Sequence, residues 1–198
     1  MRECILASGS PRRREILTNL GLPFTVAVSD ADETTAETEP GRMTEALSAR
    51  KGRAVLASLA GAGTDTAGKL LIASDTTVFC AGEILGKPRD AADAHRMLAM
   101  LSGRRHEVVS GIWLWMDGRE AISHAVTAVE FAPLTEREIA AYIASGEPFG
   151  KAGAYAIQGR AAAFIRGIAG DYFNVVGLPV NRMCELYRET FGEELLLD

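Results

Sequence analysis

The first seventeen residues constrain the fold most strongly, because they predict a strand that passes through a tight loop into a helix. The apolar run 5–7 indicates the strand, and Ser8-Gly9 ends it. Ser10 followed by Pro11 is a typical helix start, with serine as the N-cap and proline at the first helical position. We therefore expect a helix to begin at or near Pro11.

The first turn of this helix carries Arg12, Arg13 and Arg14, although the partial positive charge of a helix N-terminus favours carboxylates and disfavours cations. Free backbone N–H groups, small hydroxyl residues, a glycine and several guanidinium groups are what a polyphosphate requires. The alternative is a capped surface helix with solvated arginines. The three arginines go against the usual charge preference of a helix N-terminus, at a place where a loop leaves a strand, so the sequence favours an anion site. The stretch matches neither a Walker loop nor a Gly-x-Gly-x-x-Gly motif.

Length and composition exclude several classes of protein. With 198 residues, 47% of them hydrophobic, the chain is expected to form one globular domain, or two small lobes packed closely together. A net charge of −5 argues against general binding to nucleic acid or anionic membranes, and no apolar stretch reaches the length of a membrane span. The amino end lacks the pattern of a secretory signal, so we expect a cytoplasmic protein.

The cysteines and histidines do not indicate a metal centre. Cys4, Cys80 and Cys184 are odd in number, far apart and without a Cys-x-x-Cys pair, which favours buried reduced thiols over a disulfide framework or a zinc site. The three histidines also lack the spacing of metal ligands. We therefore do not expect a transition metal bound by histidine.

The first half of the chain also contains a predicted strand and a predicted long helix. The strand is expected at 23–28, and an alanine- and leucine-rich helix is expected at 44–60, with Lys51 near its middle. In the polar connection between them, Asp32 and Glu33 are either solvated or part of a cation site. The solvated state is preferred unless other carboxylates converge there.

The stretch 70–80 predicts a buried strand with a polar centre, and we expect the strand to be broken at 74–77. Desolvating an unpaired carboxylate is costly, so Asp75 must be paired, bind a metal or face a cleft at the end of the strand. The alternative is an aspartate that caps a helix or braces a loop. The sequence favours a chemical role, because buried charges concentrate at functional sites. A turn at 81–82 is predicted to bring Lys87 back near Asp75.

The remaining elements are predicted from capping and turn signals. In chain order they are a helix at 90–101, a hairpin of strands 107–116 and 120–131 that turns at Asp117-Gly118, a helix that starts at the capping box 135–138, a strand at 161–166 and a helix at 179–191. Lys151 and Gln158 lie in the glycine-rich stretch 147–160. This stretch forms either a second wall of a binding cleft or an ordinary surface loop.

Eight short motifs lie in order along nearly the entire chain, at 6–13, 74–76, 86–88, 102–106, 145–148, 151–155, 157–159 and 176–179. Taken together, they resemble the Maf family of nucleoside triphosphate pyrophosphatases, also called septum-formation-inhibitor-like proteins. The resemblance implies one Maf-like domain over residues 1–198 with a mixed α/β fold, similar to Maf and ITPase proteins. It also implies an elongated mixed β-sheet flanked by helices, a central cleft between two lobes, and a homodimer as a possible assembly.

The resemblance implies hydrolysis of a nucleoside triphosphate to a monophosphate and pyrophosphate, assisted by a divalent metal, Mg²⁺ or Mn²⁺. Asp75 matches the family's general base, and Glu33 matches an acidic position that assists the metal together with Asp75. Arg12, Thr76 and Gln158 match the positions associated with base choice, and the threonine and glutamine resemble the branch that acts on dTTP and UTP. The full set that matches substrate-binding positions is Ser8, Arg12, Arg13, Lys51, Thr76, Lys87, Lys151 and Gln158.

The residue types support this chemistry. Water attacks an α–β phosphoanhydride, so the site needs a carboxylate to orient or deprotonate the water and cations to absorb charge on the phosphoryl oxygens. A glutamine amide suits the edge shared by thymine and uracil, but it suits adenine equally well, so the base preference rests mostly on the resemblance. We expect a small nucleotide as substrate and no nucleic acid or membrane partner.

Three hypotheses for the function follow. The first is a housekeeping pyrophosphatase for dTTP and UTP that removes non-standard or excess nucleotides. The second is the same enzyme with a modified purine substrate, such as 7-methyl-GTP. The third is a nucleotide-binding regulator of cell division without enzymatic activity. The sequence contains no partner-binding tail or repeat, which ranks the third below the other two.

Two residues depart from the family's pattern. Gly150 stands where an aspartate is usual, so any role of that carboxylate in orienting a metal or a lysine is lost or moved. Asp171 stands where a serine is common. Neither departure touches the core motifs.

Overall fold

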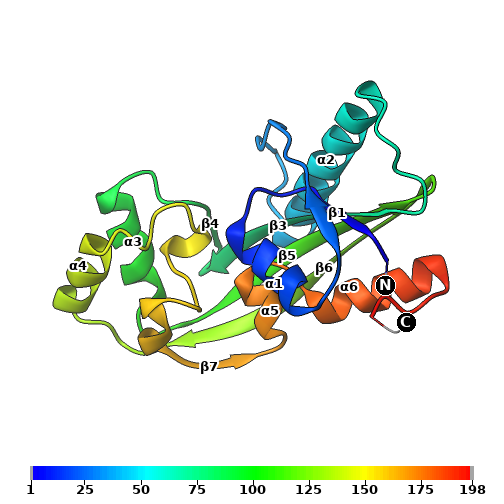
Figure 1. Ribbon diagram of the computed structural model, residues 1–198. Helices are drawn as coiled ribbons and strands as arrows, with labels where there is room; N and C mark the ends of the chain where they lie inside the picture. The colour runs from blue at the N-terminus through cyan, green and yellow to red at the C-terminus, as the bar shows by residue number, and fades with distance from the viewer. Residues whose placement is uncertain (1, 197–198) are drawn as a thin grey trace.

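The computed structural model describes residues 2–196 and contains a seven-stranded mixed β-sheet with helices on both faces (Figure 1). The strands are β1 (Cys4–Leu6), β2 (Phe24–Val26), β3 (Leu70–Cys80), β4 (Glu83–Leu85), β5 (Arg105–Met116), β6 (Arg119–Phe131) and β7 (Ile165–Ala169). The α-helices are α1 (Pro11–Asn19), α2 (Pro40–Gly61), α3 (Ala91–Leu101), α4 (Glu136–Ala144), α5 (Tyr172–Val176) and α6 (Val180–Phe191). Two 3₁₀ helices are η1 (Ala152–Ala154) and η2 (Arg160–Phe164).

The sheet combines parallel and antiparallel pairing. Its strand order is β2-β1-β3-β5-β6-β7, with β4 also paired to β3. β1 runs parallel to β2 and β3, whereas β3, β5, β6 and β7 are antiparallel neighbours. The long strands β3, β5 and β6 connect the end of the molecule that carries α3 and α4 with the end that carries α2 and α6 (Figure 1). The expected mixed α/β fold, with an elongated sheet flanked by helices, is therefore confirmed.

Cores on the two faces of the sheet hold the helices in place. On one face, Val55 of α2 packs in a cluster with Leu71 and Trp113. On the opposite face, Leu17 of α1 and Met183 of α6 belong to a second cluster. Because successive side chains of a strand point to opposite faces, β3 contributes to both clusters. A third cluster joins α3 and α4 to the far ends of the long strands.

Two glycines allow α2 to lie very close to the sheet. A Cβ atom at Gly111 would lie 2.2 Å from the backbone carbonyl carbon of Thr44, and one at Gly52 would lie 2.1 Å from the ring of the fully buried Trp113. Gly111 is also the register partner of Asp75 on the neighbouring strand. Opposite residues of an antiparallel pair share a face of the sheet, so the close approach of α2 takes place on the face that bears Asp75.

The local capping and turn signals are confirmed. The side chain of Ser10 caps α1, which begins at Pro11 as predicted. At the β5–β6 turn, Asp117 and Gly118 have φ angles of 49° and 82°, the positive values that a two-residue type I′ turn requires. Both hydrogen bonds of the capping box that begins at Thr135 are present.

The predicted start of the second helix was wrong by four residues. α2 begins at Pro40 rather than at residue 44. The Glu39 side chain accepts hydrogen bonds from the N–H groups of Gly41 and Arg42, and Pro40 occupies the first helical position. A capping carboxylate followed by proline is a start signal of the same kind as Ser10-Pro11, but it lies within a stretch that looks like a polar loop.

The predicted break in the β3 strand was also wrong. β3 continues without interruption through residues 74–77, which all pair with β5. The polar side chains remain in the strand because they find partners far away in the sequence. The Ser74 hydroxyl donates to the carbonyl of Gly177 over 3.0 Å, and the hydroxyls of Thr76 and Ser110 lie 2.8 Å apart. Buried polar groups that are hydrogen-bonded carry little net cost.

The strand predicted at 161–166 is displaced toward the carboxyl end. Residues 160–164 form η2, and the strand, β7, covers 165–169. The short helix α5 that follows was not predicted. Its N-cap is Asp171, whose carboxylate accepts a hydrogen bond of 2.7 Å from the N–H of Phe173. The aspartate that departs from the family's pattern therefore caps a helix.

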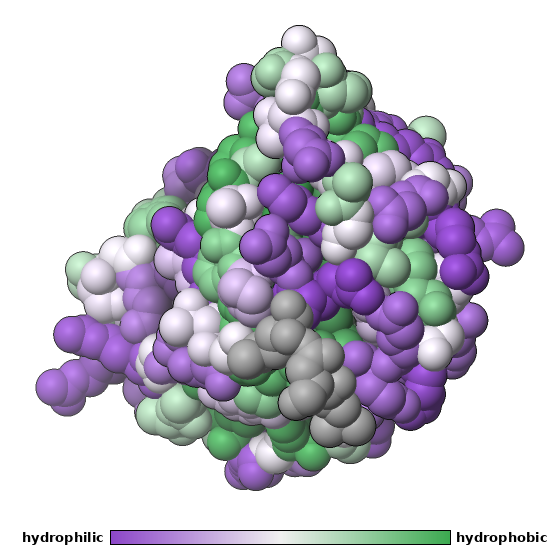
Figure 2. Space-filling model, turned by 45° about the vertical axis from the view of Figure 1, so that its right-hand side comes forward, coloured by the Kyte–Doolittle hydropathy of each residue, from purple (hydrophilic) through white to green (hydrophobic). Residues whose placement is uncertain are grey.

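The surface carries polar residues over most of the face shown in Figure 2, with apolar residues in smaller patches between them. This distribution is usual for a surface in contact with water. Among residues 2–196, no helix combines the length and the apolar character that are needed to cross a membrane.

His106 is buried beside the cluster that joins α3 and α4 to the sheet. From its burial we expect the folded protein to lose stability in acid. Its Nε2 atom lies 2.8 Å from the hydroxyl of Tyr155, its ring packs edge-on against Phe131, and burial lowers its pKa to about 4. The unfolded chain has a histidine pKa of about 6.5, so it binds more protons than the folded chain between these two values. Stability is therefore complete above about pH 6.5 and falls by about 3 kcal/mol as the pH is lowered to 4.

Urea denaturation at pH 7.5 and pH 4.5 measures this loss. The His106→Gln variant, which cannot titrate, is expected to lose about 2 kcal/mol less than the wild type between the two pH values. The matched control is His95→Gln, because His95 on α3 is only half-buried and lies outside the cluster that surrounds His106. Equal pH dependence in the wild type and in His106→Gln would contradict the assignment to His106.

Candidate active site

A cavity of about 370 Å³ opens beside one edge of β3. β1 pairs with β3 only as far as Ile72, and β4 pairs with it only from Val78 onward. Within residues 2–196, the edge between these two positions has no strand neighbour. The cavity lies in this gap, at the carboxyl end of β1, where the loop 7–10 leads into α1. Its size is within the range of sites for small molecules.

The ten residues that match the family's catalytic, substrate-binding and metal positions all line this one cavity, whereas Arg14 and Asp32 do not. The ten are Ser8, Arg12, Arg13, Glu33, Lys51, Asp75, Thr76, Lys87, Lys151 and Gln158. They come from the first loop and α1, the loop before α2, α2 itself, β3, the segment after β4, and the stretch 147–160. The structure thus places them together, whereas the role of each remains a prediction.

The cavity carries an excess of positive charge. Five cationic side chains line it, against the two carboxylates of Glu33 and Asp75, whereas the whole chain has a net charge of −5. A concave site with low-dielectric walls concentrates such a local charge and attracts counter-ions. The lining therefore favours an anionic ligand with more than one negative charge.

Arg13 is held in the cavity wall by three neutral acceptors. Its Nε donates to the carbonyl of Gly177 over 2.8 Å, Nη1 to the hydroxyl of Ser8 over 3.1 Å, and Nη2 to the hydroxyl of Thr76 over 3.2 Å. Burial lowers its pKa to about 10, so the guanidinium stays charged at neutral pH. Within the described part of the chain, no carboxylate forms a salt bridge with it. A bound anion would therefore be its strongest partner.

The turn that follows α5 fixes both cavity arginines. Arg12 donates from Nε to the carbonyl of Val176 over 3.3 Å, next to the Gly177 carbonyl that accepts from Arg13. Burial lowers the pKa of Arg12 as well. Gly177 has a φ angle of 126°, which favours glycine at this position. The 176–179 motif thus orients the cations of α1 from a distant part of the sequence.

Lys51 links the two carboxylates of the cavity. Its Nζ lies 2.5 Å from Oδ1 of Asp75 and 3.0 Å from Oε1 of Glu33. Lys87 lies farther away, with its Nζ 3.8 Å from Oε2 of Glu33. Burial raises the pKa of Glu33, but the hydrogen bond from Lys51 and the nearby positive charges outweigh this effect and lower it overall. The lysine beside Asp75 is therefore Lys51 of α2, while Lys87 pairs with Glu33.

Hydrogen bonds hold the loop that carries Glu33 against α2. Arg50 donates from Nη1 to the carbonyls of Asp32 and Thr34, over 2.7 Å in each case. The sequence left Asp32 and Glu33 together as solvated residues or members of a cation site. The structure separates them, because Glu33 lines the cavity while Asp32 is absent from its lining and caps the N–H of Thr34.

The second wall of the cavity comes from the stretch 147–160. The Glu147 carboxylate accepts from the Tyr142 hydroxyl over 2.9 Å and from the N–H of Arg160 over 3.0 Å, which closes the loop on itself. Lys151 donates from Nζ to the carbonyl of Glu147, and its pKa is lowered by burial and by Arg12. Gly150 also lines the cavity, with a φ angle of 75° and no side chain to offer.

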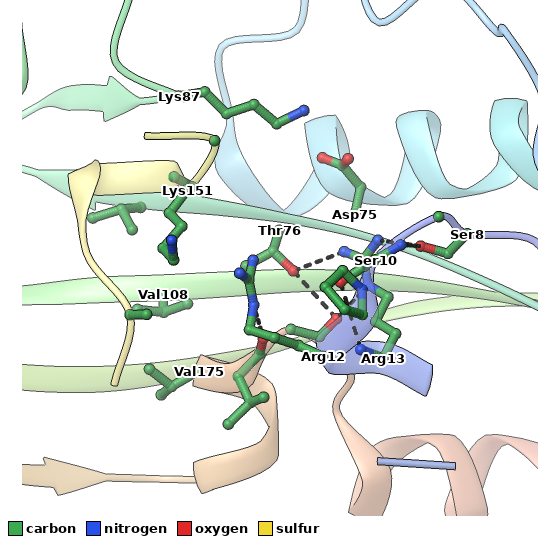
Figure 3. Close-up of a pocket in the computed structure, with 18 of the residues that line it drawn as sticks. Ser8, Ser10, Arg12, Arg13, Asp75, Thr76, Lys87, Val108, Lys151 and Val175 are labelled. Atoms are coloured by element: carbon green, nitrogen blue, oxygen red, sulfur yellow. Dashed lines mark hydrogen bonds between the residues drawn. The ribbon is translucent and has the colours of Figure 1, made fainter. Parts of the chain in front are cut away.

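One part of the lining is apolar, and the sequence did not predict it. Figure 3 shows Val108 and Val175 on the side of the cavity that bears Lys151, away from Ser8. Val78 and Ile157 also line the cavity. Valines within apolar stretches look like ordinary core residues, so no sequence signal marked Val108 or Val175. With charged groups and apolar groups in one cavity, the site suits a ligand that joins a polyanion to a flat apolar ring.

Known proteins with similar sequences or structures indicate the family. The family described as Maf-like protein matches residues 3–190. A dTTP/UTP pyrophosphatase from Symbiobacterium thermophilum is 47% identical over 97% of this chain and 95% of the relative, and one from Moorella thermoacetica is 51% identical over 94% of each. Among solved structures, a HAM1 protein from Coxiella burnetii has a TM-score of 0.46 and 19% identity, over 68% of this chain and 75% of that chain. The family match and the identity of the relatives span nearly the whole sequence, and this chain therefore belongs to the Maf family.

Proposed function

We propose that the protein hydrolyses dTTP and UTP to the nucleoside monophosphate and pyrophosphate. The observation that carries the proposal is the cavity in which five cationic side chains, two carboxylates and an apolar wall meet. Relatives at 47% and 51% identity are named dTTP/UTP pyrophosphatases. A triphosphate requires the cations, a reacting water requires a carboxylate, and a pyrimidine ring requires an apolar surface.

Arg12, Arg13 and Ser8 bind the phosphates at the amino end of α1 in this proposal. The helix N-terminus adds backbone N–H groups and a partial positive charge, which favour an anion at the same place. Lys51, Lys87 and Lys151 surround the remaining phosphate oxygens. Charge that develops on the phosphoryl oxygens during the reaction is thereby stabilised by groups that are already in position.

Asp75 orients the attacking water and accepts its proton. Its Oδ1 is bonded to Lys51, and within residues 2–196 its Oδ2 has no hydrogen-bond partner. A carboxylate fixed at one oxygen and free at the other is suited to hold a water molecule in a defined direction. Such a general base contributes about 10²- to 10⁴-fold to a reaction rate.

Glu33 and Asp75 would hold a divalent cation, Mg²⁺ or Mn²⁺. The Lys51 ammonium contacts both carboxylates, so this pair already shares one positive charge, and its oxygen donors suit these hard cations. No cluster of three or more acidic, histidine or cysteine ligands occurs in the described part of the chain. Mg²⁺ is usually bound through one or two carboxylates together with substrate phosphates, so the pair fits. When bound, the cation supplies Lewis-acid charge to the phosphoryl oxygens.

Gln158 and the apolar wall select the base in this proposal. The glutamine amide offers one donor and one acceptor, which pair with the N3–H and O4 edge that thymine and uracil share. The neighbouring Ile157, with Val108 and Val175, offers apolar surface to the pyrimidine ring. Because the amide also suits adenine, the discrimination must be measured directly.

A nucleotide panel tests the function. The protein is incubated with Mg²⁺ or Mn²⁺ and with dTTP, UTP, CTP, ATP, GTP or 7-methyl-GTP, and monophosphate and pyrophosphate are quantified. We expect turnover of dTTP and UTP, and a loss of at least about 100-fold in EDTA. A melting curve recorded in EDTA separates this loss from unfolding. Turnover restricted to 7-methyl-GTP would favour the modified-purine substrate, and no turnover on any nucleotide would favour the binding protein.

A further inference from the structure

We propose that Ser110 and Thr76 are positioning residues that act on the phosphate end of the substrate by holding Arg13. The proposal rests on the proposed function in one respect, because it takes Arg13 as a phosphate ligand. Ser110 is fully buried and does not line the cavity. The resemblance to the family links Thr76 to base choice, whereas the contacts of its hydroxyl link it to Arg13.

Three hydrogen bonds form a chain that runs in one direction from Arg13. Arg13 Nη2 lies 3.2 Å from the Thr76 hydroxyl, and that hydroxyl lies 2.8 Å from the hydroxyl of Ser110. Ser110 donates to the carbonyl of Asn174 over 2.9 Å. A carbonyl cannot donate, so the single proton of Ser110 is used there and Ser110 accepts from Thr76. Hydrogen bonds in such a directed chain polarise and strengthen one another.

The far end of the chain is firmly anchored. Thr76 and Ser110 are register partners on β3 and β5, so their side chains lie on the same face of the sheet. Asn174 is fully buried, and its Nδ2 donates to the Val108 carbonyl and to the Thr127 hydroxyl, over 2.9 Å in each case. Two strands and α5 thus fix the position of the last acceptor. Arg13 receives from this network a third anchor, in addition to the loop at Ser8 and the turn at Gly177.

The same contacts leave the Thr76 hydroxyl without a proton for a base. A hydroxyl has one donor hydrogen, and here it points to Ser110, while Arg13 occupies one of the two acceptor positions. The only other contact of this oxygen within the described residues is the Gly177 carbonyl at 3.4 Å. The hydroxyl therefore has no proton to donate to a base, and its bond to Arg13 acts on the phosphate end of the substrate.

Four variants separate this role from base recognition and from stability. Ser110→Ala breaks the chain at its buried end, and Thr76→Val removes the linking hydroxyl with little change in shape. Thr76→Ser keeps the hydroxyl and serves as the rescue variant. Ser48→Ala is the matched control, because Ser48 is also fully buried and donates to one backbone carbonyl, that of Glu45 at 2.8 Å, without lining the cavity.

The affinity for inorganic pyrophosphate is measured by calorimetry, and kcat and KM are measured for UTP and CTP. We expect Ser110→Ala and Thr76→Val to weaken pyrophosphate binding by about three- to tenfold, and Ser110→Ala to raise KM for both nucleotides by the same factor. In Ser110→Ala, the ratio of kcat/KM for UTP to that for CTP should stay within about twofold of the wild type, because Ser110 does not line the cavity. Thr76→Ser should bind pyrophosphate like the wild type, and Ser48→Ala should leave pyrophosphate affinity unchanged.

Two results would overturn the proposal. One is a change in the UTP to CTP ratio in Ser110→Ala that exceeds the change in pyrophosphate affinity, since this would mean that the network acts on the base. The other is equal pyrophosphate affinity in Ser110→Ala and Ser48→Ala. Calorimetry with pyrophosphate needs no turnover, so a failure of the proposed enzymatic function would be recognised separately from a failure of this inference.

Discussion

Replacing Asp75 with asparagine is expected to lower kcat for dTTP and UTP by about 10³-fold while leaving nucleotide binding largely intact. Asparagine keeps the size of the side chain and one oxygen for Lys51, but it cannot take the proton of the attacking water. The phosphate-binding groups Arg12 and Arg13 are unchanged. Steady-state kinetics give kcat, and calorimetry with the inactive variant gives the nucleotide affinity.

The control for this experiment is Asp65→Asn. Asp65 is an exposed residue of the connection between α2 and β3, where it caps the N–H of Ala67 and does not line the cavity. Asp65→Asn changes the net charge as much as Asp75→Asn does, but far from the site, so kcat should be unchanged. Full activity of Asp75→Asn would remove Asp75 from the mechanism.

Gly111→Ala is expected to destabilise the fold by about 3 kcal/mol, since overpacking a core against backbone atoms cannot be relieved by a side-chain rotation. The added Cβ would lie 2.2 Å from the carbonyl carbon of Thr44 and 2.6 Å from the amide nitrogen of Glu45. α2 would have to move away from the sheet. Urea denaturation followed by circular dichroism measures the change in the free energy of unfolding.

Gly167→Ala is the matched control, because Gly167 is also in a strand and a Cβ there meets no atom within 4 Å. Its stability should stay within about 0.5 kcal/mol of the wild type. Gly111→Ala should also reduce the activity of the fraction that remains folded, since Lys51 is carried by the helix that moves. Wild-type stability in Gly111→Ala would mean that α2 does not lie against β5 at this position.

The sequence predicted the elements whose signals lie within a few residues of one another. Ser10-Pro11, Asp117-Gly118 and the capping box at Thr135 each determine a local conformation, and each is present in the structure. The continuity of β3 was not predictable in this way. Ser74 remains in the strand because it bonds to Gly177, more than a hundred residues away, and a window along the chain does not contain that partner.

The same distinction applies to the site. Charged residues in unusual places, such as Arg13 at a helix start and Asp75 in a buried strand, indicate a functional site from the sequence alone, and family motifs supply the remaining polar positions. The apolar wall was missed because Val108 and Val175 have the pattern of ordinary buried residues. The placement of Lys51 between two carboxylates was also missed, because it depends on how close α2 comes to the sheet.

The edge of β3 between Ile72 and Val78, which has no strand neighbour within the described residues, affects how the protein behaves in a crowded solution. An open strand edge is a template on which another chain can pair, and proteins commonly protect such edges with charged side chains. Here Arg13 and Lys51 stand at the opening left by the short strand β1. The cations assigned to the substrate therefore also discourage edge-to-edge association, and variants that neutralise them call for a check of aggregation alongside activity.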